Sequence, residues 1–269
     1  LIKKHNPRVK IIVKIEKNEA VDNLEEILKQ TDAVMVARGD LAIETDNTTV
    51  PIVQQKIIKL ARQLQKPVIV ATQMLESMTE NPRPTRAEVS DVATAVMDQA
   101  DCVMLSAESA SGKYPVEAVS TMNHVIQTVE ANPEQRHYIK INWENVMASD
   151  LALYGIAASA CSLAYRVGAK AIVVGTATGR TAQIISAFRP DTKIIAVTHD
   201  ELTRNQLNMV WGVQPIIVKP TTNFNTFVEH IFNEVSELDH FKKGDKLVIV
   251  TGLTAGVSGT TNTIKIATI

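Results

Sequence analysis

Short apolar segments alternate with longer amphipathic segments over the first half of the chain, and this alternation limits the possible folds more than any other feature of the sequence. The apolar segments are rich in valine and isoleucine, and they occupy Val9–Ile15, Ala33–Ala37, Pro67–Ala71 and Cys102–Leu105. Segments that are apolar almost throughout are typical of strands buried on both faces of a parallel sheet. The amphipathic segments predict helices at Glu19–Gln30, Val50–Gln65, Arg86–Gln99 and Pro115–Asn132.

Four strand–helix units in succession predict half of a (β/α)8 barrel over residues 1–132. A small open α/β sheet is the alternative that the pattern alone leaves open. In (β/α)8 barrels the catalytic residues lie at the C-terminal ends of the strands. The residues that follow each apolar segment are therefore the first candidates for a functional site.

A second α/β series follows a polar interruption. Asn132-Pro133-Glu134-Gln135-Arg136 ends the first pattern, and we expect a linker over residues 133–145. Residues 146–269 then predict a three-layer α/β domain with helices at Asp150–Val167, Arg180–Phe188, Glu201–Val210 and Thr226–Leu238. Its strands are expected at Ala171–Gly175, Lys193–Thr198, Val213–Val218, Lys246–Thr251 and Thr263–Ile269.

Composition and charge argue against several functional classes. The 269 residues are 45% hydrophobic and 21% charged with a formal net charge of −1, which is typical of a globular protein and gives no electrostatic reason to expect a nucleic-acid partner. No segment approaches the roughly 18 consecutive apolar residues of a membrane helix. Two cysteines, Cys102 and Cys161, cannot form a disulfide framework, so we expect a cytoplasmic protein.

Charged residues stand at the ends of the first two predicted strands. Alternation along a strand places the side chains of Lys14 and Glu16 on the same side. Charges inside a sheet are costly unless they pair or bind a ligand, so the sequence permits either a structural ion pair or a cation beside a metal-binding carboxylate. After the second strand, Gly39 leaves room for an anion at the backbone, and Asp40 supplies a further carboxylate. Two carboxylates with water and substrate oxygens match the preference of Mg²⁺.

The third and fourth predicted strands also end in polar residues. The hydroxyl of Thr72 can reach the same pocket, although a threonine at such a position is also a common helix cap. Ser106 and Glu108 follow the fourth strand. Four strands that all end in polar groups predict one shared site at this edge of the sheet.

Four blocks of the sequence resemble the pyruvate kinase family in order and spacing. They are Ile12-Val13-Lys14-Ile15-Glu16-Lys17-Asn18-Glu19, Met35-Val36-Ala37-Arg38-Gly39-Asp40-Leu41, Ala71-Thr72-Gln73-Met74-Leu75-Glu76-Ser77-Met78 and Pro82-Arg83-Pro84-Thr85-Arg86-Ala87-Glu88. The resemblance covers essentially the whole chain, and it implies the second half of a (β/α)8 barrel followed by a three-layer α/β regulatory domain. It also implies transfer of a phosphoryl group from phosphoenolpyruvate to ADP, which gives pyruvate and ATP in glycolysis, with Mg²⁺ or Mn²⁺ as cofactor, in a homotetramer.

The resemblance implies a role for each residue at the strand ends. Lys14 matches the lysine that stabilises charge on the phosphoryl group during transfer, and Glu16 and Asp40 match the ligands of the divalent ion. The backbone N–H groups of Gly39 and Asp40 match those that hold the substrate carboxylate. Thr72 matches the threonine near the carbon atom that is protonated.

Other matches are less direct. Ser106 and Glu108 match a polar layer thought to relay the proton, and the block Pro84-Thr85-Arg86 matches a contact between subunits. The sequence departs from the usual family motif at Ala42, Gln99 and Ala107, each of which stands where the family commonly has glycine. None of these departures removes a role assigned above.

A second candidate site lies in the later α/β domain. Backbone N–H groups, threonine hydroxyls and an arginine would converge on an anion at a helix N-terminus, at Thr176, Thr178, Gly179, Arg180 and Thr181. Simple capping of the helix by threonine is the alternative. The segment resembles the loop that holds an effector phosphate in the family, and residues 251–263 resemble the loop that closes over it, which implies a sugar phosphate or bisphosphate as effector.

Parts of the family pattern have no match in the chain. The K⁺ site, an arginine for the substrate phosphate and the lid domain all belong to the first part of the family's barrel. Because the chain starts in a strand pattern at Leu1 without a methionine, we expect that an N-terminal portion is missing and that the chain is inactive by itself. An inert effector-binding and subunit-contact module is the alternative function, and a metal-dependent aldolase on a related barrel is a further one.

Overall fold

The computed structural model describes residues 1–132, 150–221, 223–238, 241–252, 259 and 261–269. The chain divides into two compact units, Leu1–Arg136 and His137–Ile269. The predicted linker at residues 133–145 lies outside the described residues. Among the helices described here, none combines the length and the apolar character needed to cross a membrane.

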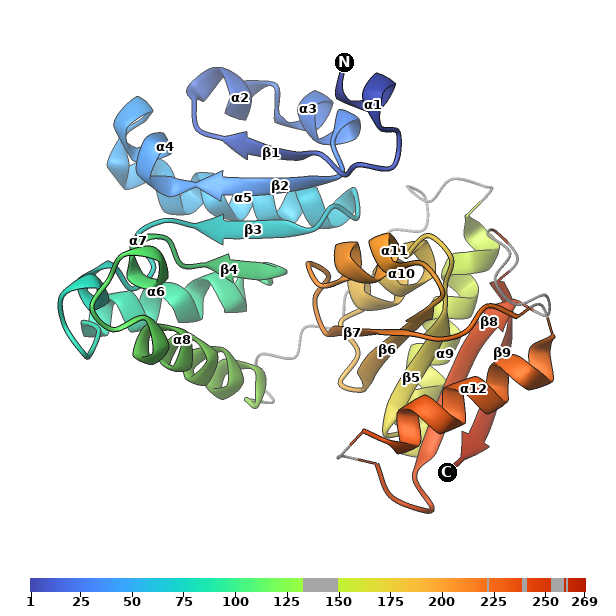
Figure 1. Cartoon of the computed structure of the whole chain (residues 1–269). Coiled ribbons are helices and arrows are strands. Elements are labelled where there is room, and N and C mark those ends of the chain that lie inside the picture. Colours follow the sequence, from blue (N-terminus) through green and yellow to red (C-terminus); the bar gives the residue numbers. More distant parts are fainter. Residues whose placement is uncertain (133–149, 222, 239–240, 253–258, 260) are drawn as a thin grey trace. The chain divides into compact units, whose positions relative to one another are not determined.

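The first unit contains a four-stranded parallel sheet in the order β1-β2-β3-β4 (Figure 1). The strands are β1 (Ile12–Ile15), β2 (Ala33–Ala37), β3 (Val68–Ala71) and β4 (Cys102–Met104). The register pairs Lys14 with Met35, Met35 with Ile69, and Ile69 with Cys102. The four predicted strands are confirmed, and because they are parallel their C-terminal ends lie along one edge of the sheet.

Helices connect the strands of this unit, and most follow the predicted pattern. The predicted helices correspond to α2 (Asn18–Asp22), α3 (Leu24–Gln30), α5 (Val50–Gln63), α6 (Arg86–Met97) and α8 (Pro115–Glu130). The single helix predicted at Glu19–Gln30 is wrong in one respect, because Asn23 leaves helical geometry with a ψ of 22° and divides it into α2 and α3. The short elements α1 (Ile2–His5), α4 (Arg38–Glu44), η1 (Asn47–Thr49), η2 (Glu76–Thr79) and α7 (Ala107–Ala110) were not predicted.

Alternation along the strands separates a core face from a second face. The core face contributes Ile15, Val34, Val36, Val68 and Val70 to a cluster that α3, α5, α6 and α8 complete. Lys14, Met35 and Ile69 point to the opposite face, outside this core. The helices therefore cover the core face of the sheet and not the face that carries Lys14.

The second unit is a three-layer α/β domain, as predicted. Its strands β5 (Ala171–Gly175), β6 (Lys193–Thr198), β7 (Val213–Ile217), β8 (Lys246–Gly252) and β9 (Thr261–Thr268) form one sheet in the order β7-β6-β5-β8-β9. Only the β8–β9 pair is antiparallel among these strands. Pro215 lies within β7, which fits an edge strand because proline has no N–H to donate to a second neighbour.

Two apolar clusters cover the two faces of this sheet. One cluster joins β5, β6 and β8 to the helices α9 (Leu151–Val167), α10 (Arg180–Ala187) and α11 (Glu201–Leu207). The other joins the opposite faces of the same strands to α12 (Phe224–Ser236). The polar loop between β5 and α10 therefore connects a strand and a helix that are both packed into the core.

Gly175 and Gly155 provide a matched test of this packing. A Cβ at Gly175 would lie 2.7 Å from Thr251 Oγ1 and 2.8 Å from the Phe227 ring, so we expect Gly175→Ala to lower the free energy of unfolding by about 1–3 kcal/mol. Gly155 lies inside α9 with no heavy atom within 4 Å of such a Cβ, so Gly155→Ala should instead raise it by about 0.5–1 kcal/mol. Urea denaturation of both variants checks the prediction, and shifts of the same sign would contradict it.

Candidate active site

The candidate site of the first unit lies where the C-terminal ends of β1 to β4 meet. Glu16 directly follows β1, α4 begins directly after β2, and Thr72 directly follows β3. Ser106 lies two residues after the end of β4 and precedes α7. The parallel register therefore places the ends of four separate segments along one edge, as the sequence predicted.

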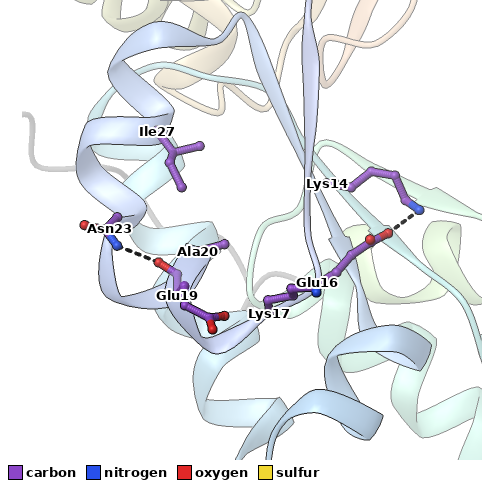
Figure 2. A pocket seen from close by; sticks show the side chains of 7 residues that line it. All are labelled: Lys14, Glu16, Lys17, Glu19, Ala20, Asn23 and Ile27. Carbon is purple, nitrogen blue, oxygen red and sulfur yellow. Dashed lines mark hydrogen bonds and ion pairs between the residues drawn. The ribbon is translucent and has the colours of Figure 1, made fainter.

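Lys14 lies between two carboxylates at this edge. Its ammonium contacts Glu16 Oε1, and the two side chains point toward one another from β1 (Figure 2). The same Nζ atom lies 4.0 Å from Asp40 Oδ2 on α4. All three side chains are partly exposed, so solvent and ligands can reach them. The structure thus brings together the three charged residues that the sequence singled out.

The contact between Lys14 and Glu16 shifts the pKa values of both groups. The hydrogen bond to Glu16, followed by charge attraction, raises the pKa of Lys14 above its usual value. The hydrogen bond from Lys14 lowers the pKa of Glu16 below its usual value, and Asp40 contributes a smaller effect in the same direction. Both groups are therefore charged at neutral pH.

The donor set at this edge fits a hard divalent cation. The Lys14 ammonium already places a positive charge between the carboxylates of Glu16 and Asp40. Within the described ranges, no third histidine, cysteine, aspartate or glutamate side chain joins these two carboxylates in a metal-binding group. A site with two protein carboxylates suits Mg²⁺, which retains water and substrate oxygens in an octahedral shell.

A surface pocket adjoins the Lys14–Glu16 pair. It has a volume of about 470 Å³, and it is lined on one side by residues at the end of β1 and on the other by residues of α2 and α3 (Figure 2). Its lining residues are Lys14, Glu16, Lys17, Glu19, Ala20, Asn23 and Ile27. Both residues of the pair therefore contribute to the lining of this pocket.

Thr72 contacts the backbone at the start of α4. Its Oγ1 accepts a hydrogen bond of 2.8 Å from the N–H of Gly39 and donates one of 2.6 Å to Ala71 O. The hydroxyl therefore stabilises the first turn of a helix across the sheet instead of capping a helix that follows it. A Cβ at Gly39 would lie 3.5 Å from this oxygen, so glycine keeps space open beside the hydroxyl.

The turn after β3 has an unusual backbone. Thr72 has a φ of 68° and Gln73 a φ of 52°, so two successive residues with side chains lie in the left-handed region. A β-branched residue in this region is rare, and each such residue costs on the order of 1–3 kcal/mol. Surrounding contacts must hold this turn in place.

Glu108 and Ser106 meet at the end of β4. Glu108 is buried, and its two carboxylate oxygens accept hydrogen bonds from the N–H of Leu75 at 3.1 Å and of Ser106 at 2.7 Å. Glu108 therefore ties the segment after β3 to the segment after β4. Glu108 thus links Ser106 to Leu75, three residues after Thr72.

Arg38 and Asp91 are site residues that the sequence analysis missed as a pair. The guanidinium of Arg38 is buried beneath the Thr72 turn and forms an ion pair with Asp91 of α6 at 2.6 Å. The two residues are 53 positions apart. No hydrophobic periodicity in the sequence indicates that Arg38 is buried, and only the fold shows that Asp91 is its partner.

The block Pro84-Thr85-Arg86 lies at the start of α6. Thr85 and Glu88 form a reciprocal capping box, and Glu88 also accepts hydrogen bonds from the N–H and the hydroxyl of Ser77. Burial raises the pKa of Glu88, but the hydrogen bonds from Ser77 and Thr85 together outweigh this effect, so the pKa lies below its usual value. The block is thus rigidly joined to the segment after β3.

The second candidate site lies at the N-terminus of α10. Thr176 Oγ1 accepts a hydrogen bond of 3.0 Å from Gly179 N–H, and Thr181 Oγ1 lies 3.0 Å from Thr261 Oγ1. Arg180 forms an ion pair of 2.5 Å with Asp150, and half of its side chain is exposed. Within the loop Thr176 contacts Gly179, whereas Thr181 and Arg180 contact residues of other segments, and Thr178 lies between Thr176 and Gly179 in sequence. Most of the predicted closing loop, residues 253–258 and 260, lies outside the described residues.

Comparisons with known proteins agree with this architecture. The family model described as "Pyruvate kinase, barrel domain" matches residues 1–119, and "Pyruvate kinase, alpha/beta domain" matches residues 155–267. The pyruvate kinase of Lactobacillus delbrueckii subsp. bulgaricus is 44% identical over 259 residues, which cover 96% of this chain and 44% of that protein. The pyruvate kinase of Staphylococcus aureus strain MRSA252 is 41% identical, and the match covers 99% of this chain and 45% of that protein.

A solved structure supports the same assignment. The pyruvate kinase from Cryptosporidium parvum superposes with a TM-score of 0.88 at 36% sequence identity, covering 97% of this chain and 51% of that chain. The chain spans less than half the length of the two curated relatives. Two domain matches in the family's order, together with this superposition, show that the chain belongs to the pyruvate kinase family and contains parts of its barrel domain and its alpha/beta domain.

Proposed function

We propose that the edge formed by β1 to β4 is part of a pyruvate kinase active site, which transfers a phosphoryl group from phosphoenolpyruvate to ADP. The observation that carries the proposal is the position of the Lys14 ammonium between the carboxylates of Glu16 and Asp40. Phosphoryl transfer is catalysed mainly by positioning and by stabilisation of charge, and these three groups supply both.

Lys14 is proposed to stabilise negative charge on the transferred group. Its raised pKa keeps the ammonium protonated at neutral pH, so it supplies a full positive charge. Glu16 and Asp40 would hold Mg²⁺ or Mn²⁺, which acts as a Lewis acid and template when bound. Because the ammonium contacts Glu16 in this structure, a bound ion would compete with Lys14 for this carboxylate.

The N–H groups at the start of α4 are proposed to bind the substrate carboxylate. The Gly39 N–H donates to Thr72 Oγ1, so the carboxylate would replace this hydroxyl as the acceptor. The released Thr72 hydroxyl could then face the carbon atom that is protonated. Ser106 would belong to the proton relay, with Glu108 holding it through the Ser106 N–H.

The loop before α10 is proposed to bind a phosphate group of a sugar phosphate effector. Its donors are Arg180, the threonine hydroxyls and the N–H groups of the first helical turn. Because Asp150 neutralises Arg180, effector binding would exchange an ion pair within the domain for one with the ligand. A cytoplasmic homotetramer that uses K⁺ is part of the same proposal for the complete protein.

The activity assay uses the 269-residue chain with phosphoenolpyruvate, ADP, Mg²⁺ and K⁺. The relatives are more than twice as long as the matched region, so we expect no turnover from the chain alone. Pyruvate formation is measured with a coupled dehydrogenase assay. Robust turnover would show that these residues suffice for the reaction and would refute the expectation that the chain is inactive alone.

Metal binding tests the two carboxylates. Glu16→Gln and Asp40→Asn should each weaken Mn²⁺ binding at least about tenfold, because each removes one of two charged ligands. Lys14→Met should strengthen it by about threefold to tenfold, since a competing positive charge is lost. The measurement is electron paramagnetic resonance of free Mn²⁺. Glu25→Gln, which removes a carboxylate paired with Lys29 on α3, is the control and should leave the affinity unchanged.

Proton competition provides a second readout of the same site. The Lys14 hydrogen bond lowers the pKa of Glu16, so the carboxylate stays ionised below its usual titration range. In Lys14→Met this effect is lost, and the pH below which Mn²⁺ affinity falls should move upward. A pH profile that is the same in both proteins would contradict the assigned role of the pair.

Phosphate binding by the second unit is tested at Arg180 and Asp150. Arg180→Ala should weaken binding of a sugar phosphate at least about tenfold, because it removes a charged donor. Asp150→Asn should strengthen binding, because it frees the guanidinium. Calorimetry with glucose 6-phosphate and fructose 1,6-bisphosphate as probes measures both effects. Unchanged affinity in both variants would exclude this loop as the phosphate site.

A further inference from the structure

The left-handed turn at Thr72 and Gln73 is held by one buried side chain. The Arg38 guanidinium donates two hydrogen bonds to Thr72 O, one from Nε at 3.2 Å and one from Nη2 at 2.6 Å. It also lies 3.1 Å from Gln73 O and 2.8 Å from Met74 Sδ. Both residues of the strained turn, together with Met74 directly after it, therefore contact the Arg38 guanidinium.

Asp91 fixes the orientation of this guanidinium. Its carboxylate contacts the remaining terminal nitrogen through both oxygens, at 2.7 Å and 2.6 Å. The Arg38 side chain is 7% exposed, whereas Asp91 is 36% exposed. Burial makes the arginine depend on its partners, because an unpaired charge at this depth would be strongly unfavourable.

The contacts form a closed circuit between α4 and the turn. Arg38 holds the Thr72 carbonyl, and the Thr72 hydroxyl accepts the hydrogen bond of Gly39, the residue that follows Arg38. Neither segment can shift without breaking one of these contacts. The circuit thereby fixes the backbone of the Thr72 turn relative to the first N–H groups of α4.

We propose that Arg38, oriented by Asp91, is a positioning residue that holds the backbone of the Thr72 turn beside the first turn of α4, where the substrate carboxylate would bind. The inference rests on the proposed function for its consequence in catalysis, but the positioning itself can be measured without substrate. Lysine could not replace Arg38, because a single ammonium cannot contact two carbonyl groups and a carboxylate in this planar arrangement.

Amide hydrogen exchange of the 269-residue chain, followed by NMR, tests the proposal. Asp91→Asn should accelerate exchange at the Gly39 N–H about tenfold or more, and Arg38→Lys should have a larger effect. The reference is the Val34 N–H, which donates to Pro67 O in the buried sheet and reports global opening. Its exchange should change much less than that of Gly39. Asp91→Asn keeps the shape of the side chain, so it remains informative if Arg38→Lys does not fold.

The matched control is Glu80→Gln, which breaks an exposed ion pair between Glu80 and Lys113 in the same unit. It should leave the exchange at Gly39 unchanged. Unchanged exchange at Gly39 in Asp91→Asn, or equal acceleration at Gly39 and Val34, would overturn the proposal.

A second measurement separates this proposal from the proposed function. Oxalate, a planar dianion that resembles the enolate of pyruvate, should bind the Mn²⁺ complex of Asp91→Asn about tenfold more weakly than that of the parent chain, while Mn²⁺ affinity alone stays within about twofold. If the parent chain binds no Mn²⁺, the proposed function fails, and the exchange experiment still decides the role of Arg38. If Mn²⁺ and oxalate bind equally well to both proteins, the positioning role in substrate binding is wrong.

Discussion

The parallel register of β1 to β4 is the constraint on which the candidate active site depends. Because the strands run in one direction, the ends of four segments that are distant in sequence share one edge of the sheet. The same alternation that buries Ile15 in the core turns Lys14 to the opposite face. Core packing and chemistry are therefore linked, since a shift of one residue in the register would exchange the two sets of side chains.

Both candidate sites are internally paired in this structure. The Lys14 ammonium lies between two carboxylates, and Thr72 accepts the Gly39 N–H. In the second unit, Arg180 is paired with Asp150. The charged side chains are partly exposed, but each already has an internal partner that a binding ligand must replace. The affinity of each site for its ligand thus depends on the difference between the contacts made with the ligand and those made with the internal partners. A substitution of an internal partner should therefore change the affinity.

Rigidity around the first site comes from neighbouring segments. Glu108 holds Leu75 and Ser106, Glu88 holds Ser77, and Arg38 holds the Thr72 turn. These contacts link α6 and the end of β4 to the residues after β3. A strained turn persists only when several contacts determine it together, and strain of this kind is concentrated at functional sites.

The sequence by itself determined the strands, most of the helices and the charged residues at the strand ends, because alternation and amphipathic spacing are local properties of the chain. The placement of Lys14 and Glu16 on one side follows from that alternation alone. Helix α4 was not predicted, since Ala37 at its start provides no side-chain cap, and the cap comes from Thr72 across the sheet. The left-handed turn and the Arg38–Asp91 pair were likewise decided by tertiary structure, because Arg38 holds Thr72 from 34 positions away and pairs with Asp91 from 53 positions away, and only the packed fold creates these contacts.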